Sequence, residues 1–462
     1  MTNSRLFCVL LVCLALGTLS LLVAGEPVYD AWAWLAWGRE LTHLQLETSS
    51  GPAWKPLPVI LTAALSLAGD AAPQLWLVLV RAAWLAALLL AAQIAFVLAA
   101  GRPRPLRLAG AAFAAICVVL LGDEVTHWSR QVAGGMAEPL LVALVLGAVS
   151  AALATRTRTA LALGALAALV RPEAFALLAI FGLWCWRVDP RQRPLIVVVA
   201  LGVPGLWLAP ELLAGGRGGA QRAQTGTSDP LEALGWAAAL PLAVAWPLAL
   251  AALGDGRARV LGAGAVGWIA LVAAMTLAGF AGLPRFMAPA AALVAVLGGA
   301  GLAALLARPV RPSTWVVALT VPALVVTVVG LPGRVAELPH AWRSAARISD
   351  SHDRLRELAN GVGRERLLAC GRLATSDVLV RTALAWELGV PLSHVVSFGK
   401  RPRLSGAFVM GPQAQAGLRR GVRDTATAVA HNGEWSVYSI DCPATASSSA
   451  AARSAGVTGA TR

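Results

Sequence analysis

Charged residues are scarce in this chain of 462 residues, of which they make up only 13%. A soluble globular domain carries roughly 25%, so the sequence excludes an ordinary soluble enzyme. Its 58% of apolar residues also excludes a disordered chain. Lysine is rarer still, since Lys55 and Lys400 are the only two and the other basic residues are arginines. Each lysine is therefore a candidate for a specific role.

The motifs of nucleotide and metal chemistry are missing as well. The sequence contains no GxxxxGK[ST] loop, no GxGxxG that opens a helix, no HExxH and no zinc-type spacing of Cys and His. We therefore expect no metal and no other cofactor. Any activated substrate should come from the membrane.

Long apolar runs are abundant instead. A bilayer-spanning helix needs roughly 20 mostly apolar residues. Runs that meet or approach this length lie at 6–24, 74–100, 106–121, 136–154, 194–213, 235–253, 260–279, 285–306 and 313–331. A further stretch, 160–187, contains Arg171-Pro172-Glu173, and proline disfavours helix at the residue before it. We expect two helices there, 158–170 and 173–187, and thus an all-α polytopic membrane protein with about 11 transmembrane helices.

One apolar run, 57–69, is too short to span and follows Pro56. We expect an interfacial or half-inserted helix there.

The arginines predict the orientation of the chain. The short loops on one side carry Arg102, Arg104, Arg107, Arg156, Arg158, Arg187, Arg191, Arg193, Arg257, Arg259, Arg308 and Arg311. The positive-inside rule then makes the N-terminus cytoplasmic and the C-terminal region extracytoplasmic, in the cell membrane. The net charge of +14 follows from this topology. The sequence contains no basic stripe interleaved with stacking aromatics. It therefore gives no indication of a nucleic-acid partner.

Composition changes near residue 332. We expect a transmembrane domain over 1–331, a small extracytoplasmic α/β domain over 332–442 and a disordered tail over 443–462, which is rich in Ala, Ser, Gly and Thr. Within the α/β domain the pattern predicts helices at Ser344–Leu358 and around Val378–Leu388. It predicts strands at Arg366–Ala369 and Trp435–Ile440.

Two cysteines, Cys370 and Cys442, lie in the α/β domain. An oxidising compartment favours a disulfide between them. Two free buried thiols are the alternative.

The densest group of chemically interesting residues follows the first apolar run. Asp30, Trp34 and Trp37 have helical spacing, so Asp30 should begin a helix along the membrane surface. At least two of the tryptophans Trp32, Trp34 and Trp37 are expected to be interfacial anchors. Asp30 is either a helix N-cap or a base for a hydroxyl at the water–lipid boundary.

Four more groups complete the candidate site. Lys55 lies between Trp54 and Pro56, where it either pairs with a phosphate or snorkels to the interface. The others are a loop with Asp123, Glu124, His127, Arg130 and Glu138, the Arg171-Pro172-Glu173 turn, and Arg285-Phe286-Met287-Ala288-Pro289. Ionisable groups at membrane depth usually face a cavity or a partner. Arg171 and Glu173 could equally pair with each other, and Arg285 could equally be a headgroup anchor.

The five groups, in this order and on one predicted face, resemble the GT-C-fold glycosyltransferases, and in particular an actinobacterial branch that acts on cell-wall glycans. The resemblance implies a GT-C-like domain that transfers arabinofuranose or mannose from a polyprenyl-phosphate donor to a cell-envelope glycan or glycolipid acceptor. Asp30 would be the general base. Lys55, Arg171 and Arg285 would bind the donor phosphate, and Trp34, Trp54, Arg130, Glu138 and Glu173 would bind substrate.

The sequence departs from this family in one respect. Many relatives carry two adjacent acids after the first span, whereas Ala31 follows Asp30 here. Because this acid stands alone, we expect no bound metal, and a non-catalytic GT-C-like membrane protein stays an open alternative. The competing class of function is a transporter or flippase for a lipid-linked substrate. A transporter would predict internal pseudo-symmetry and ionisable groups near the bilayer midplane. The sequence shows no repeat, and its polar groups lie at span ends.

Overall fold

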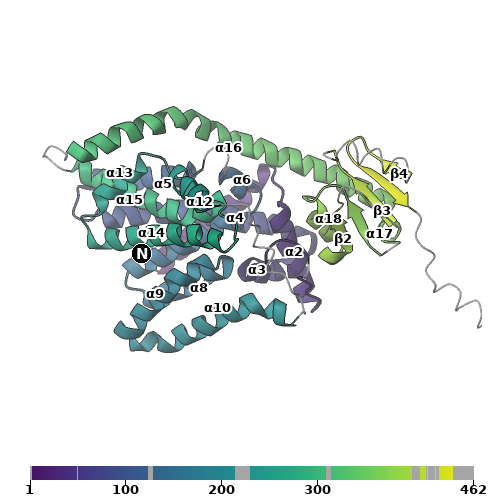
Figure 1. The fold of residues 1–462 in the computed structure, drawn as a ribbon, viewed down its shortest axis with the longest axis horizontal. Coiled ribbons are helices and arrows are strands. Elements are labelled where there is room, and N and C mark those ends of the chain that lie inside the picture. Colours follow the sequence, from purple (N-terminus) through teal and green to yellow (C-terminus); the bar gives the residue numbers. More distant parts are fainter. Residues whose placement is uncertain are drawn as a thin grey trace, which may run out of the picture. The chain divides into compact units, whose positions relative to one another are not determined.

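Helices dominate the computed structural model, which describes residues 3–48, 50–122, 128–213, 229–307, 314–369, 371–397, 406–412, 414, 422 and 426–440 (Figure 1). Contacts divide the chain into two units, Met1–Ser349 and Asp350–Arg462. The first is helical and the second contains a small sheet. Cys370, Cys442, the predicted tail 443–462, and Asp123, Glu124 and His127 lie outside the described residues.

The helical unit consists of α-helices joined by short 3-10 turns. Its α-helices are α1 (Asn3–Leu19), α2 (Tyr29–Thr42), α3 (Pro56–Ser66), α4 (Ala72–Leu98), α5 (Arg104–Val119), α6 (Trp128–Ala133), α7 (Glu138–Leu153), α8 (Thr157–Val170), α9 (Glu173–Val188), α10 (Arg193–Leu213), α12 (Pro230–Ala239), α13 (Ala245–Ala252), α14 (Gly256–Leu277) and α15 (Ala288–Leu306). The 3-10 turns are η1 (Ser20–Leu22), η2 (Gly69–Ala71), η3 (Pro190–Gln192) and η4 (Pro284–Met287). The predicted short helix after Pro56 and the break before Pro172 are both confirmed.

Proline and acidic residues explain several helix starts. Proline occupies one of the first two positions of α3, α4, α5, α7 and α12, where its missing N–H would have no partner within the helix. Asp229 caps α12 by accepting a hydrogen bond from the backbone N of Glu232 at 2.6 Å. Asp255 caps α14 in the same way.

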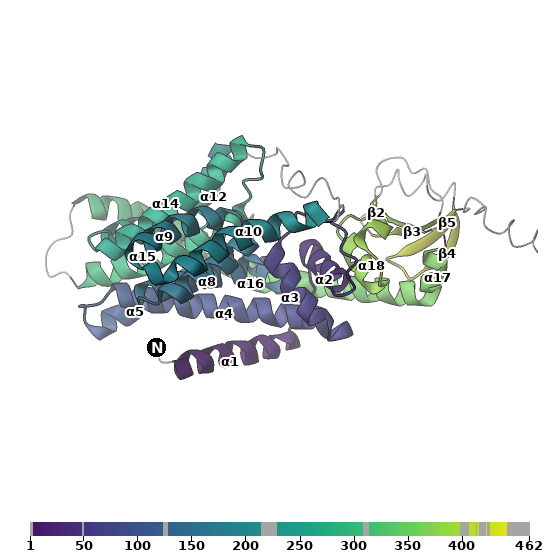
Figure 2. The same cartoon turned by 90° about the horizontal axis from the view of Figure 1, so that it is seen from below.

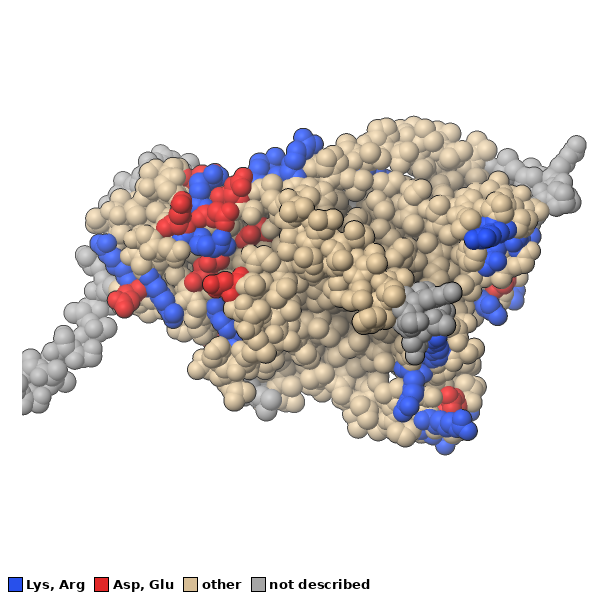
Figure 3. Space-filling model, turned by 180° about the vertical axis from the view of Figure 1, so that it is seen from behind, with Lys and Arg blue, Asp and Glu red and all other residues tan. Residues whose placement is uncertain are grey.

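The helices give the unit the surface of a membrane protein. Among the described residues, five helical stretches are long and apolar enough to cross a bilayer: Gly69–Leu98, Pro190–Pro210, Gly256–Leu277, Pro284–Leu306 and Ala318–Val362. Shorter apolar helices, such as Glu138–Leu153, add to them. Much of the helical surface seen in Figure 3 is tan, without charged side chains, and basic side chains gather at its right-hand end. The chain is a multi-pass membrane protein, while the count of about 11 spans stays a prediction.

Helix α15 is the buried centre of the helical unit. It packs against α13, α5, α14 and α4, while α1 lies along α4 (Figure 2). Glycines allow the close approach on two sides of α15. A Cβ at Gly299 would collide with the backbone of Gly110 in α5, and one at Gly301 would collide with the carbonyl of Leu248 in α13. Because α15 follows η4 directly, its packing fixes the segment that carries Arg285.

Helix α16 (Thr314–Val362) corrects the predicted arrangement of a span over 313–331 and a separate helix at Ser344–Leu358. It is one helix, with Pro322, Pro332 and Pro339 inside it. Arg334 of α16 donates hydrogen bonds to backbone carbonyls elsewhere in the helical unit, among them those of Leu120 and Ala239. The boundary between the two units falls within α16.

The second unit is an α/β fold, as predicted. Its elements after α16 are α17 (Arg364–Leu367), β1 (Leu373–Thr375), α18 (Arg381–Glu387), η5 (Leu392–His394), β2 (Val395–Ser397), β3 (Gly406–Met410), β4 (Thr427–His431) and β5 (Ser436–Ile440). The strand order is β2-β1-β3-β5-β4; β1 is parallel to β2 and β3, and β5 is antiparallel to β3 and β4.

Side chains from the sheet form the core of this unit. Phe408, Met410 and Tyr438 pack together there. The strand predicted at Arg366–Ala369 is wrong, because α17 occupies Arg364–Leu367. Gly363 separates α17 from the end of α16 at Val362, and its φ of 87° suits glycine. Periodicity alone does not separate a short apolar strand from a short helix.

The packing of α15 makes a testable prediction. Gly301→Ala adds a methyl group against the Leu248 carbonyl, and overpacking of this kind typically costs about 1–3 kcal/mol. We expect a lower melting temperature of the detergent-solubilised protein. Gly264→Ala is the matched control, since a Cβ at this position of α14 meets nothing within 4 Å. Equal melting temperatures for the two variants would contradict close packing at Gly301.

Candidate active site

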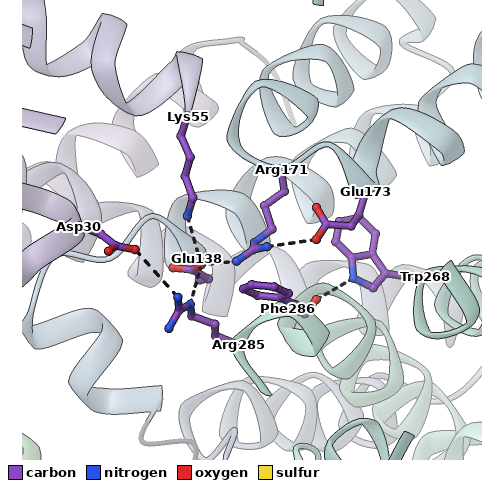
Figure 4. A network of polar contacts seen from close by, with 8 residues as sticks. All are labelled: Asp30, Lys55, Glu138, Arg171, Glu173, Trp268, Arg285 and Phe286. Carbon is purple, nitrogen blue, oxygen red and sulfur yellow. Dashed lines mark hydrogen bonds and ion pairs between the residues drawn. The ribbon is translucent and has the colours of Figure 1, made fainter. Parts of the chain in front are cut away.

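Six ionisable side chains from distant parts of the chain meet in the helical unit (Figure 4). All of them lie at helix ends. Asp30 is in the first turn of α2, Lys55 directly precedes α3, and Glu138 is the first residue of α7. The list is completed by Arg171 and Glu173 on either side of Pro172, and by Arg285 in η4. We call these six residues the charge cluster.

Glu138 is the centre of the charge cluster. Its Oε1 atom lies 3.0 Å from Arg171 Nη2, 3.5 Å from Lys55 Nζ and 3.6 Å from Arg285 Nε. The Glu138 side chain is completely buried. One carboxylate oxygen thus holds together the three basic residues that the sequence predicts as phosphate ligands.

Arg171 is the most constrained of the three bases. Its Nη1 atom donates a hydrogen bond to Glu173 Oε1 at 3.1 Å, while Nη2 binds Glu138. The flat face of its guanidinium lies over the ring of Phe286, with Cζ 3.4 Å from the ring centroid. Arg171 and Glu173 are both buried. The pairing of Arg171 with Glu173, an open alternative from the sequence, is therefore present together with the bond to Glu138.

Arg285 and Asp30 form the accessible edge of the charge cluster. Their side chains are 31% and 20% exposed, respectively, whereas the side chain of Arg171 is 6% exposed. Arg285 Nη2 lies 4.0 Å from Asp30 Oδ2. Asp30 does not cap α2, because the helix begins at Tyr29 and its N-cap is Val28, with no side-chain cap bond in the described residues. The N-cap alternative for Asp30 is wrong.

The charge cluster is balanced, with three acids (Asp30, Glu138, Glu173) facing three bases (Lys55, Arg171, Arg285). Removal of one partner from a buried ion pair leaves an uncompensated charge, which is strongly destabilising. Within the described residues, Oε2 of Glu138 and of Glu173 are buried and have no hydrogen-bond partner.

The described part of the chain also contains no group of three or more His, Cys, Asp or Glu side chains that could hold a metal ion.

Burial and a neighbouring carboxylate have opposite effects on the pKa of Lys55. Burial lowers the pKa of its ammonium group, and the Glu138 carboxylate acts in the opposite direction. The ammonium nitrogen also lies 4.9 Å from the ring centroid of Trp34, a favourable position for a desolvated cation. Lys55 is buried and paired, so it does not snorkel to the membrane interface.

The tryptophans of α2 are core residues. Trp32, Trp34 and Trp37 are all at most 1% exposed, so the expectation that at least two of them anchor the helix at the membrane interface is wrong. Trp34 packs edge-on against Trp76. Trp54 packs against Trp37 and donates a hydrogen bond to the Leu206 carbonyl at 3.2 Å. The Trp34 ring also contacts Lys55 of the charge cluster.

Arg130, predicted to bind substrate, has different neighbours. Its Nη2 atom lies 3.1 Å from Nδ1 of His340 and 3.6 Å from Glu337, both in α16. Among the described residues, its ion pair is thus with α16 and not with the charge cluster. The structure brings together Asp30, Lys55, Glu138, Arg171, Glu173 and Arg285, with Trp34 beside Lys55.

Two aromatic residues of the site were not predicted as site residues. Phe286 contacts Arg171 through its ring, and Trp268 of α14 donates a hydrogen bond from Nε1 to the Phe286 carbonyl at 2.8 Å. The sequence signal for Phe286 is its position directly after Arg285. Trp268 has no such signal, because it lies in an apolar run of α14.

The central role of Glu138 can be tested by removing its charge. Glu138→Gln leaves three cations with less compensation, and breaking a buried ion pair costs about 3–5 kcal/mol. We expect a large fall in melting temperature and a partial recovery in the double variant Glu138→Gln/Lys55→Met, which also removes one cation. Glu337→Gln is the control at a more exposed ion pair. A double variant less stable than Glu138→Gln would contradict the charge-balance argument.

Comparison with known proteins supports the fold. No protein-family model matches the chain, and no curated protein matches its sequence. The structure is similar to the crystal structure of ArnT from Cupriavidus metallidurans in the apo state, with a TM-score of 0.58 and 15% identity over 94% of this chain and 98% of that one. ArnT from the same organism bound to undecaprenyl phosphate gives a TM-score of 0.55 and 14% identity over 95% and 98%. This likeness supports the GT-C fold.

Proposed function

We propose that the protein is a membrane glycosyltransferase that transfers a sugar from a polyprenyl-phosphate donor to a hydroxyl group of an acceptor. Lys55, Arg171 and Arg285 meet at Glu138, with Asp30 at the accessible edge of the cluster, and this arrangement supports the proposal. Three cations beside one accessible carboxylate suit a reaction in which a phosphate leaves and a hydroxyl attacks.

The lipid nature of the donor is supported by the fold. A structure similar to this one, ArnT, is described as bound to undecaprenyl phosphate. The helical unit has a membrane-type surface. The phosphate of a polyprenyl lipid lies at the water–lipid boundary, where the cluster is expected from the predicted topology.

The three bases have different roles in this proposal. Arg285 binds the donor phosphate, because it is the most exposed of the three and its ion-pair distances, 3.6 Å and 4.0 Å, are long. Lys55 adds a second positive charge. Arg171 acts as a positioning residue, since its two terminal nitrogens already bind Glu138 and Glu173.

Asp30 is the general base. Its carboxylate would accept the proton of the acceptor hydroxyl while that oxygen attacks the anomeric carbon, and the bond from this carbon to the phosphate oxygen breaks with inversion. The leaving phosphate gains negative charge, which Arg285 and Lys55 stabilise because they are already in place. The resemblance of the sequence motifs favours arabinofuranose or mannose as the sugar and a cell-envelope glycan or glycolipid as the acceptor.

The experiment is the substitution Asp30→Asn in purified protein reconstituted into liposomes. Sugar transfer is measured with undecaprenyl-phosphate arabinofuranose and, separately, undecaprenyl-phosphate mannose. The amide cannot accept the proton, so we expect the transfer rate to fall by about 10²–10⁴-fold. The melting temperature should stay near that of the wild type, since Asp30 is partly exposed and makes only a long ion pair.

Asp70→Asn is the matched control, because Asp70 is an exposed carboxylate in η2. It should transfer sugar at the wild-type rate. Near-normal transfer by well-folded Asp30→Asn would end the assignment of Asp30 as base. A wild-type protein that moves the lipid-linked sugar across the bilayer without transferring it would instead favour a flippase.

A further inference from the structure

Phe286 connects the two arginines of the charge cluster. Its ring centroid lies 3.4 Å from Cζ of Arg171 and 5.5 Å from Cζ of Arg285, and Figure 4 shows the ring directly below the Arg171 guanidinium and to one side of the Arg285 guanidinium. Both guanidinium groups also approach Oε1 of Glu138. Two like charges therefore converge on one oxygen atom, with an aromatic ring beside them.

The ring constrains Arg171 in a direction that the carboxylates do not. Glu138 and Glu173 bind the edge of the guanidinium, through Nη2 and Nη1. Phe286 packs against its flat face, where the negative electrostatic potential of the ring attracts a cation. The edge contacts and the ring contact together restrict the orientation of Arg171.

The backbone of Phe286 is held as firmly as its ring. Trp268 is 1% exposed and donates a hydrogen bond from Nε1 to the Phe286 carbonyl at 2.8 Å. This bond joins α14 to η4, the 3-10 turn that also carries Arg285. Phe286 therefore packs against the guanidinium of Arg171 and also holds the backbone from which the Arg285 side chain extends.

We propose that Phe286, anchored by Trp268, is a positioning residue that holds Arg171 in place and sets the orientation of Arg285 toward the phosphate of a polyprenyl-phosphate ligand. The inference rests on the proposed function, because it takes this phosphate as the ligand. Phe286 itself does not touch the reacting atoms. Its loss should weaken recognition of the phosphate more than it slows the chemical step.

The first test compares Phe286→Leu with Phe96→Leu. Leucine keeps the apolar bulk but removes the aromatic face. Phe96 is a matched control, since Arg107 Cζ lies 3.7 Å from its ring centroid at a different place in the helical unit. We expect Phe286→Leu to weaken binding of undecaprenyl phosphate in nanodiscs roughly tenfold. Phe96→Leu should bind like the wild type, and Phe286→Tyr should restore binding to within about threefold of it.

A second pair of variants tests the anchor. Trp268→Phe removes the indole N–H and should also weaken binding. Trp246→Phe removes a similar bond, from Trp246 Nε1 to the Ala238 carbonyl at 3.2 Å, and should leave binding unchanged. These substitutions keep an aromatic ring, so they test the inference even where Phe286→Leu fails to fold.

Kinetics separate positioning from a purely structural role. Positioning predicts a higher KM for the donor in Phe286→Leu with little change in kcat, whereas partial unfolding would lower kcat and leave KM unchanged. Wild-type binding by well-folded Phe286→Leu would overturn the inference while the proposed function stands. A wild-type protein that neither binds undecaprenyl phosphate nor transfers sugar would overturn both.

Discussion

A buried carboxylate shared by three cations is the interaction on which the candidate site depends. Without Glu138, the side chains of Lys55, Arg171 and Arg285 would repel one another in a poorly solvated place. With it, the three side chains lie close together, at 3.0–3.6 Å from one oxygen atom. An incoming phosphate then meets positive groups already in place, and little reorganisation is needed.

The helical scaffold explains how such a cluster can form. Its residues come from helix ends, where the chain turns and a polar side chain can leave the apolar surroundings. Pro172 ends α8 and separates Arg171 from Glu173, so both side chains reach the same region. Arg285 and Phe286 lie in η4, directly before the buried helix α15. The close packing of α15 at its glycines therefore stabilises the site as well as the fold.

The sequence predicted the parts of this structure that follow from short-range rules. Proline marked the break at Arg171-Pro172 and the start of the short helix at Pro56, and the ordered motifs identified all six members of the charge cluster. The sequence missed what depends on tertiary packing. The tryptophans of α2 have the spacing of interfacial anchors, yet neighbouring helices bury them. Nothing in the spacing of Arg130 indicates that its neighbours are Glu337 and His340, some 200 residues away.

In the proposed reaction the charge cluster binds the phosphate of a lipid carrier beside Asp30. The most direct measurement is an experimental density map of the protein in nanodiscs that contain undecaprenyl phosphate. We expect phosphate density within hydrogen-bonding distance of the Arg285 guanidinium, with the Asp30 carboxylate facing the same space. Phosphate density that is well defined elsewhere in the helical unit, with Arg285 still bound only to Glu138 and Asp30, would contradict it.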